Sequence, residues 1–391
     1  MKRFFFILAV AVTAITACTK SELTSEPLNN EISFQAANYV TSTKVSGAEF
    51  PKTDVFGTFA WTAGTATTYF IDNQRVSYNE TKDVWTTATP YYWPKNQSVD
   101  FFSYYPYNGN GSVPTVVSAT QIKYNAIDFT DNQTDFMYAD KAVGYTDNAN
   151  SVEDGVSARG GVPTFFRHAG AKVHINVILG ENEKVETVTG TKTKWEVILK
   201  EVVLSGIYTK GDCVLNLAST PTEGIVPWVK PVNNATDNYY VWTPDVNVTN
   251  DVTNSLYKDN QQRTLVKGEG QEVIPMFYAL PQVLVANQQK ISLKLIIKAY
   301  RTVPGDATYP EYPAEPYLTQ AGTDGTGKVF TADLRIANDD PTTSILAWQM
   351  NQAITYNITL GPAGQQITFD PAVDAWESKT AQSSIDISLD L

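Results

Sequence analysis

The stretch Glu31-Ile32-Ser33-Phe34-Gln35-Ala36 alternates polar and apolar side chains. A period of two residues is typical of a β-strand that buries one face and exposes the other. Ile32, Phe34 and Ala36 form the apolar set, so we expect these three side chains to face a core. Polar segments lie on both sides of this strand and separate it from the rest of the chain.

On the N-terminal side, residues 19–31 are polar and predict a flexible tether. Before them come Lys2 and Arg3 and then a run of about twelve apolar residues, Phe4 to Ile15, which is the pattern of a secretory signal. That run is shorter than the roughly 20 residues that a membrane-spanning helix needs. The sequence therefore predicts export, with residues 1–17 as the signal peptide.

The signal ends in Ile15-Thr16-Ala17-Cys18, which resembles a bacterial lipobox with Ile in place of the commoner Leu. We expect Cys18 to be acylated and the chain to be cut just before it, so that acyl chains hold the precursor to a membrane. The alternative is an ordinary secretory signal, which would leave Cys18 as a free thiol.

On the C-terminal side, residues 41–47 form a polar segment with one basic residue, Lys44. Exposed polar loops are where proteases preferentially cut, and a trypsin-like enzyme needs a basic residue. Lys44 is thus a candidate processing site that would create a new end at Val45. A solvated lysine with no such role is the alternative.

The composition indicates a β-rich surface protein. Of 391 residues, 18% are charged, 42% hydrophobic and 12% aromatic, which is enough apolar material for two cores. The net charge of -12 argues against nucleic acid as a partner. The other cysteine, Cys213, has no partner if Cys18 carries lipid, and we expect it to be a small buried hydrophobe.

From Val45 onward, short apolar runs are separated by Gly, Pro and Asn, and no segment keeps a helical period. Expected strands include residues 54–61, a strand after the Pro94–Ser98 turn that ends near Pro106, a strand pair or bent strand over residues 162–177, and the regular run from Ile291 to Ile297. The fold class is therefore all-β. The charged segment 181–194 is the expected boundary between two domains.

The segment Ser384 to Leu391 alternates again, with Ile385, Ile387, Leu389 and Leu391 on one face. Two interpretations remain open for it. It can be a final strand of its own domain, or a strand that is received by another subunit, because an apolar strand without a partner would promote aggregation.

No catalytic or metal-binding pattern is present. His168 and His174 are the only histidines, and no cysteine or acidic cluster lies beside them in the sequence. Asp128, Asp131 and Asp135 are typical of turns. We therefore expect no enzyme activity, no cofactor and no metal.

Several motifs together resemble the fimbrillin family of Bacteroidales. Their order and spacing carry the resemblance, which covers nearly the whole chain: the lipobox, the strand with Phe56-Gly57, Tyr92-Trp93-Pro94 leading to Tyr104-Tyr105-Pro106, Asp135-Phe136-Met137-Tyr138-Ala139, Phe166-Arg167-His168-Ala169 and the ending Asn351 to Trp376.

The resemblance implies a pilus subunit with two transthyretin-like β-sandwich domains in tandem. It divides the chain into a signal (1–17), a tether with a removable first strand (18–44), an N-terminal sandwich (45–185), a C-terminal sandwich (186–376) and a donor strand (377–391). It also implies an outer-membrane lipoprotein precursor at the cell surface. There a trypsin-like protease would remove the first strand, after which a strand of another copy or another fimbrial subunit would fill the gap.

The sequence leaves two functions open. One is a polymerising fimbrial subunit that supports adhesion. The other is a surface lipoprotein that never polymerises and binds glycans or host ligands through its aromatic side chains.

Overall fold

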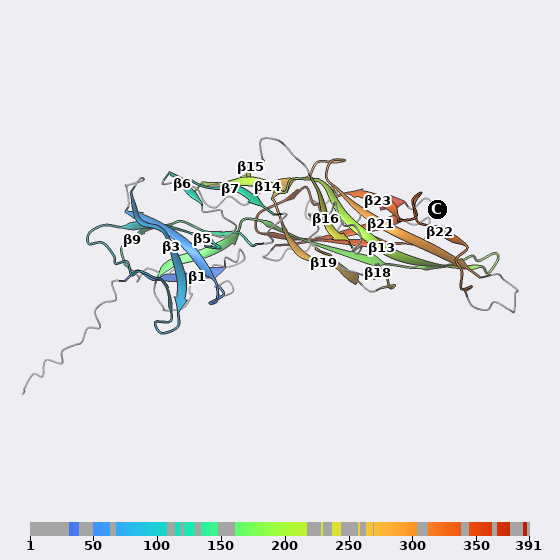
Figure 1. The fold of residues 1–391 in the computed structure, drawn as a ribbon, viewed down its shortest axis with the longest axis horizontal. Helices are drawn as coiled ribbons and strands as arrows, with labels where there is room; N and C mark the ends of the chain where they lie inside the picture. The colour runs from blue at the N-terminus through green and yellow to red at the C-terminus, as the bar shows by residue number, and fades with distance from the viewer. Residues whose placement is uncertain are drawn as a thin grey trace, which may run out of the picture.

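The computed structural model describes residues 31–38, 50–62, 68–107, 114–118, 121–129, 134–147, 161–216, 228–229, 237–243, 257–258, 263–268, 270–302, 312–337, 344–361, 366–375 and 386–388. Their regular structure is β-strand throughout, which confirms the all-β class. The molecule is elongated, with the early strands at one end and the late strands at the other (Figure 1). No helix in these residues is long and apolar enough to span a bilayer.

The first sheet lies at the end of the molecule that holds the early strands, and it closes on itself. Its strands, in the order β2-β3-β4-β1-β10-β8-β5, form a seven-stranded barrel because β5 also pairs with β2, and β9 extends β5 outside that ring. The strands are β1 (Phe34–Asn38), β2 (Val55–Thr62), β3 (Tyr69–Asn79), β4 (Val84–Thr87), β5 (Val99–Tyr105), β8 (Met137–Ala139), β9 (Ala142–Tyr145) and β10 (Val162–His168).

Two further sheets form the other end. One has the order β19-β11-β25-β26-β27, made of β11 (Ala171–Leu179), β19 (Gly270–Ala279), β25 (Gln352–Leu360), β26 (Gln366–Ala375) and β27 (Asp386–Ser388). The second is built around the long antiparallel pair β13 (Lys192–Ile207) and β21 (Lys290–Arg301), joined by β12 (Glu183–Val185), β16 (Asp237–Thr243), β17 (Tyr257–Lys258), β18 (Arg263–Thr264), β22 (Leu318–Gln320) and β23 (Lys328–Asp333).

Alternation explains how these two sheets enclose a core. In β11, every second residue from Ala171 to Leu179 is buried, and β21 follows the same pattern from Ile291 to Ala299. Both sets belong to one apolar cluster. This second core thus begins at Ala171, before the division that we expected at residues 185 and 186.

A smaller sheet ties the two ends together. It has the order β15-β14-β7-β6, and its central antiparallel pair joins β7 (Gln121–Asp128) to β14 (Lys210–Asn216), flanked by β6 (Thr115–Ser118) and β15 (Trp228–Val229). A separate ribbon pairs β20 (Gln282–Val283) with β24 (Ala347–Trp348). An apolar cluster beneath the connecting sheet combines barrel residues such as Phe102 with Cys213, Leu280 and Met350. Cys213 is fully buried, as expected.

Candidate functional site

The candidate site is the place that β1 occupies in the barrel. Along its whole length β1 pairs in parallel with β10, from Phe34 beside Val162 to Asn38 beside Phe166. Its other edge pairs with β4 only through Phe34 and Trp85. Just before the strand, Glu31 bridges to Tyr92 and the Ile32 amide donates to the Tyr91 carbonyl at 2.8 Å. This strand therefore closes the barrel between β4 and β10.

Side chains of β1 and of Ile32, which lies just before it, pack into the barrel interior. Ile32 and Phe34 are 1% and 2% exposed, and Ala36 packs partly buried against the same cluster. The Phe34 ring meets the rings of Phe56 and Phe101 edge-on, at 5.9 Å and 5.8 Å between centroids. Two of the three side chains of the predicted apolar face, Ile32 and Phe34, are thus buried in the core, and Ser33 and Ala37 on the other face are buried as well.

The backbone of β1 lies close to Gly161, the residue just before β10. Gly161 has φ of +148°, and a Cβ at this position would meet the Phe34 carbonyl carbon at 3.0 Å and the Ser33 carbonyl oxygen at 3.2 Å. These neighbours are backbone atoms, which cannot move aside as the end of a flexible side chain does. A side chain at this position would therefore be strained while β1 is in place, and glycine avoids that strain.

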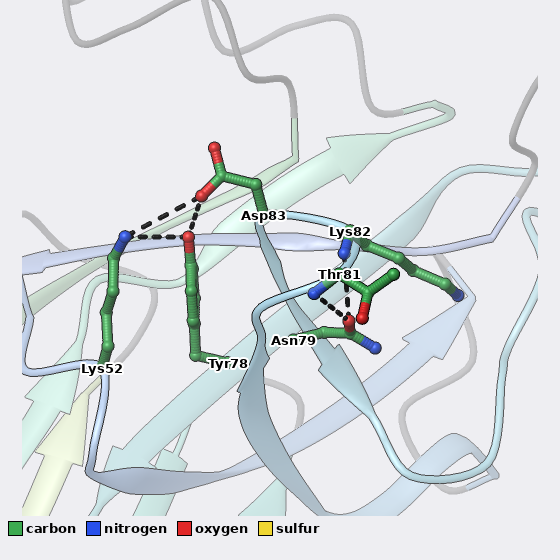
Figure 2. A network of polar contacts seen from close by, with 6 residues as sticks. All are labelled: Lys52, Tyr78, Asn79, Thr81, Lys82 and Asp83. Carbon is green, nitrogen blue, oxygen red and sulfur yellow. Dashed lines mark hydrogen bonds and ion pairs between the residues drawn. The ribbon is translucent and has the colours of Figure 1, made fainter.

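The turn between β3 and β4 contacts the chain just before β1. Its conformation is fixed by Asn79, whose side-chain oxygen accepts the amides of Thr81 and Lys82, both at 3.0 Å (Figure 2). The Lys82 ammonium then lies 2.5 Å from the Glu31 carboxylate, whose side chain is largely buried. This ion pair joins residues that are far apart in the sequence, so no local pattern indicated it.

The same turn holds the chain after the candidate cleavage segment. Lys52 donates to the Tyr78 hydroxyl at 2.8 Å, and that hydroxyl donates to Asp83. Lys52 also lies 3.8 Å from Asp83. In Figure 2 the Lys82 side chain extends away from this group, so the turn makes two separate sets of contacts.

Several polar side chains contact one another between the barrel and the sheet that contains β11 and β19. His168 at the end of β10 contacts Asp135 at 2.8 Å, an acidic neighbour that the sequence did not reveal. Burial and the nearby Asp135 carboxylate raise the pKa of Tyr278 on β19. Asp128, in contrast, pairs with Lys210 of β14. The described residues contain no group of three or more His, Cys, Asp or Glu side chains arranged to hold a metal ion.

The remaining predicted site residues are only partly covered by the structure. Cys18, Lys44, Val45, Ile385, Leu389 and Leu391 lie outside the described residues. Ile387 lies in β27, where its backbone pairs with Ile367 of β26 at the edge of the sheet. For residues 386–388 the pairing within the chain matches the first of the two interpretations of this segment.

Comparison with known proteins gives one family and several solved structures to which the chain is similar. The fimbrillin-like family matches residues 43–376. A fimbrial protein from Bacteroides vulgatus is 14% identical, with a TM-score of 0.44, over 88% of this chain and 99% of that one. The tip fimbrial protein Mfa3 from Porphyromonas gingivalis is 10% identical, with a TM-score of 0.36, over 88% of this chain and 99% of that one.

The search of curated proteins found no significant match. The family match nevertheless covers most of the sequence, from the segment after β1 to the end of β26. The chain therefore belongs to the fimbrillin-like family, whose members are structural proteins and not enzymes.

Proposed function

We propose that this protein is a structural subunit of a cell-surface fimbria that polymerises by strand exchange and supports adhesion. It reaches the surface as an outer-membrane lipoprotein precursor acylated at Cys18. A trypsin-like protease then cuts after Lys44, and the segment that contains β1 leaves. The strand of a neighbouring subunit, carrying Ile385, Ile387, Leu389 and Leu391, takes its place. In this proposal the two halves correspond to the two transthyretin-like domains of the family.

The observation that carries the proposal is the position of β1 between β4 and β10. It is the first described strand, it contributes Phe34 to the barrel core beside Ile32 just before it, and it lies directly before the segment that contains Lys44. Loss of β1 would leave β10 without a hydrogen-bonding partner on the side opposite β8. Each unpaired buried backbone group costs about 1–3 kcal/mol.

A strand from another copy would restore what is lost. Its backbone would complete the hydrogen bonds of β10, and each large apolar side chain that it buries contributes roughly 1.5–3 kcal/mol. The donor and acceptor surfaces are different parts of the molecule, so the contact is heterologous and propagates as a filament. Partners are thus further copies or related fimbrial subunits.

Limited proteolysis of the purified precursor tests this function. A trypsin-like protease should produce a new N-terminus at Val45, detected by mass spectrometry, and a ladder of oligomers on a denaturing gel without heating. The Lys44→Gln variant is the matched control and should remain an uncut monomer. A wild-type chain that stays intact and monomeric and binds oligosaccharides would support the non-polymerising alternative instead.

A further inference from the structure

The segment near the C-terminus repeats the sequence pattern of β1. The stretch Glu31-Ile32-Ser33-Phe34-Gln35-Ala36 reads acidic, Ile, Ser, large apolar, polar, apolar, and Asp386-Ile387-Ser388-Leu389-Asp390-Leu391 reads the same in the same direction. Two of the six positions are identical, and a third keeps its acidic charge. This similarity defines one register and one direction for a strand that replaces β1.

Lys82 favours that register over others because it pairs with an acidic residue at the position of Glu31. In the intact chain its ammonium pairs with Glu31, at 2.5 Å, where the chain enters the barrel seam. When Glu31 leaves with the first strand, Lys82 lacks this carboxylate. A replacing strand that has an acid at this position supplies a new partner, and Asp386 is the residue that the sequence pattern places there.

Other registers fail on one of two grounds. A shift by one residue turns the apolar side chains out of the barrel, because strand side chains alternate between faces. A shift by two residues keeps the faces but puts Ser384 or Ser388 opposite Lys82. Only the register with Asp386 at the Glu31 position places an acidic side chain opposite Lys82 and also directs the apolar side chains into the barrel. In this register Ile387 takes the place of Ile32, and Leu389 takes the place of Phe34.

We propose that Lys82 sets the register of strand exchange by pairing with Asp386 of a second copy, whose strand then runs parallel to β10. This inference rests on the proposed function and specifies its partner segment residue by residue. Among the described residues, 386–388 have strand conformation and pair with Gln366, Ile367 and Thr368 of β26. Exchange would replace this pairing with the ladder along β10.

A charge swap in the full chain tests the register. After cleavage, Asp386→Lys should polymerise roughly threefold to tenfold more slowly than wild type, by light scattering, because two lysines then meet at the seam. Lys82→Glu should be slowed similarly, and the double variant Lys82→Glu with Asp386→Lys should recover most of the wild-type rate.

Two matched controls change charge without changing this pair. Lys52→Glu changes a residue that contacts the same turn through Tyr78 and Asp83, and Asp390→Lys changes the same tail at the position that corresponds to Gln35. Both should polymerise at close to the wild-type rate. If Asp390→Lys slows assembly as much as Asp386→Lys, or if the double variant shows no recovery, the register is wrong.

A cross-linking measurement tests direction as well. Phe34 is the partner of Val162 in β10, so Leu389→Cys combined with Val162→Cys should give intermolecular disulfides in the polymer. Ile387→Cys with Val162→Cys should not, and the reverse result would overturn the register. If the cleaved wild-type chain does not polymerise at all, the proposed function itself fails, and this outcome is distinct from polymerisation that ignores the charge swap.

Discussion

At the scale of single residues, Phe34 connects the first strand to the barrel. Its ring lies among Phe56, Phe101 and the other residues of the barrel core, with the strand backbone against Gly161. Both features belong to the short segment that we propose is exchanged. Substitutions there should therefore change the stability of the precursor more than substitutions at neighbouring exposed sites.

Phe34→Ala should lower the free energy of unfolding of the precursor by about 3–5 kcal/mol, because it removes a buried aromatic ring and leaves a cavity. Tyr92→Ala is the control, since Tyr92 is next to the same seam but 57% exposed, and its effect should stay within about 0.5 kcal/mol. Urea denaturation measures both. Equal effects of the two variants would contradict the assignment of Phe34 to the core.

Gly161→Ala should destabilise the precursor by about 1–3 kcal/mol, because the new Cβ overlaps the backbone of β1. Gly144 also has positive φ, but a Cβ there meets nothing within 4 Å. The Gly144→Ala control therefore reports backbone strain alone. Gly161→Ala should in addition speed proteolytic loss of the first strand, followed by mass spectrometry. A rate of loss unchanged from wild type would contradict the close approach.

Removing the hydroxyl group should affect stability differently at two buried tyrosines, Tyr356 and Tyr124. Tyr356 accepts a hydrogen bond from Trp348 Nε1 at 2.9 Å and donates one to the Leu334 carbonyl at 3.0 Å, whereas the buried hydroxyl of Tyr124 has no partner among the described residues. Tyr356→Phe should therefore cost about 1–3 kcal/mol, and Tyr124→Phe should be neutral or slightly stabilising. Thermal unfolding of the two variants side by side measures this difference, and a larger loss for Tyr124→Phe would refute it.

At the scale of elements, many strands were predictable from local pattern. The run predicted at residues 54–61 is β2, the regular run from Ile291 lies within β21, and the alternation from Lys172 is β11. Residues 162–177 were expected to be a strand pair or one bent strand. They are two strands that break at Ala169 and Gly170 and contribute to different sheets.

The pairing of these elements was not predictable from the sequence alone. Closure of the barrel depends on β2 pairing with β5, and the connecting sheet depends on β7 pairing with β14, which lies far along the chain. Tertiary packing decides such contacts. The alternation of side chains within a strand does not indicate which other strand it pairs with. For the same reason, only part of the candidate site could be predicted from the sequence. The apolar face of β1 follows from alternation, whereas Lys82 and Gly161 come from distant segments.

At the scale of the whole molecule, stability should decline at alkaline pH. The Tyr105 hydroxyl donates to Asp54 at 3.0 Å, and burial together with that carboxylate raises the pKa of Tyr105 to about 12. An unfolded tyrosine has a pKa of about 10. The neutral phenol is thus favoured in the folded state, so its contribution is fully present below pH 10 and is lost as the pH rises through about 12.

Urea midpoints measured between pH 9 and pH 11.5 should therefore fall, and the fall should be shallower in Tyr105→Phe, which has no phenol to ionise. Tyr312, whose pKa is also raised to about 12, remains in that variant, so some decline should persist. An identical pH dependence in both proteins would show that Tyr105 contributes nothing to it.

The arrangement of the molecule places the two proposed exchange elements far apart in the sequence and in different sheets. The first strand closes the barrel, and residues 386–388 form the outer edge of the sheet that contains β11 and β25. A chain with an acceptor in one half and a donor in the other is suited to head-to-tail assembly. The apolar cluster and sheet between the halves would transmit force along such a filament.

The most direct measurement is assembly of a chain that lacks residues 384–391, cleaved beside the wild type and followed by electron microscopy. In our proposal, removal of β1 would open the barrel seam in both proteins, and only the wild type would retain a strand to close the seam of its neighbour. The wild type should form filaments and the shortened chain should remain monomeric. Filaments of equal number and length from the shortened chain would contradict the account.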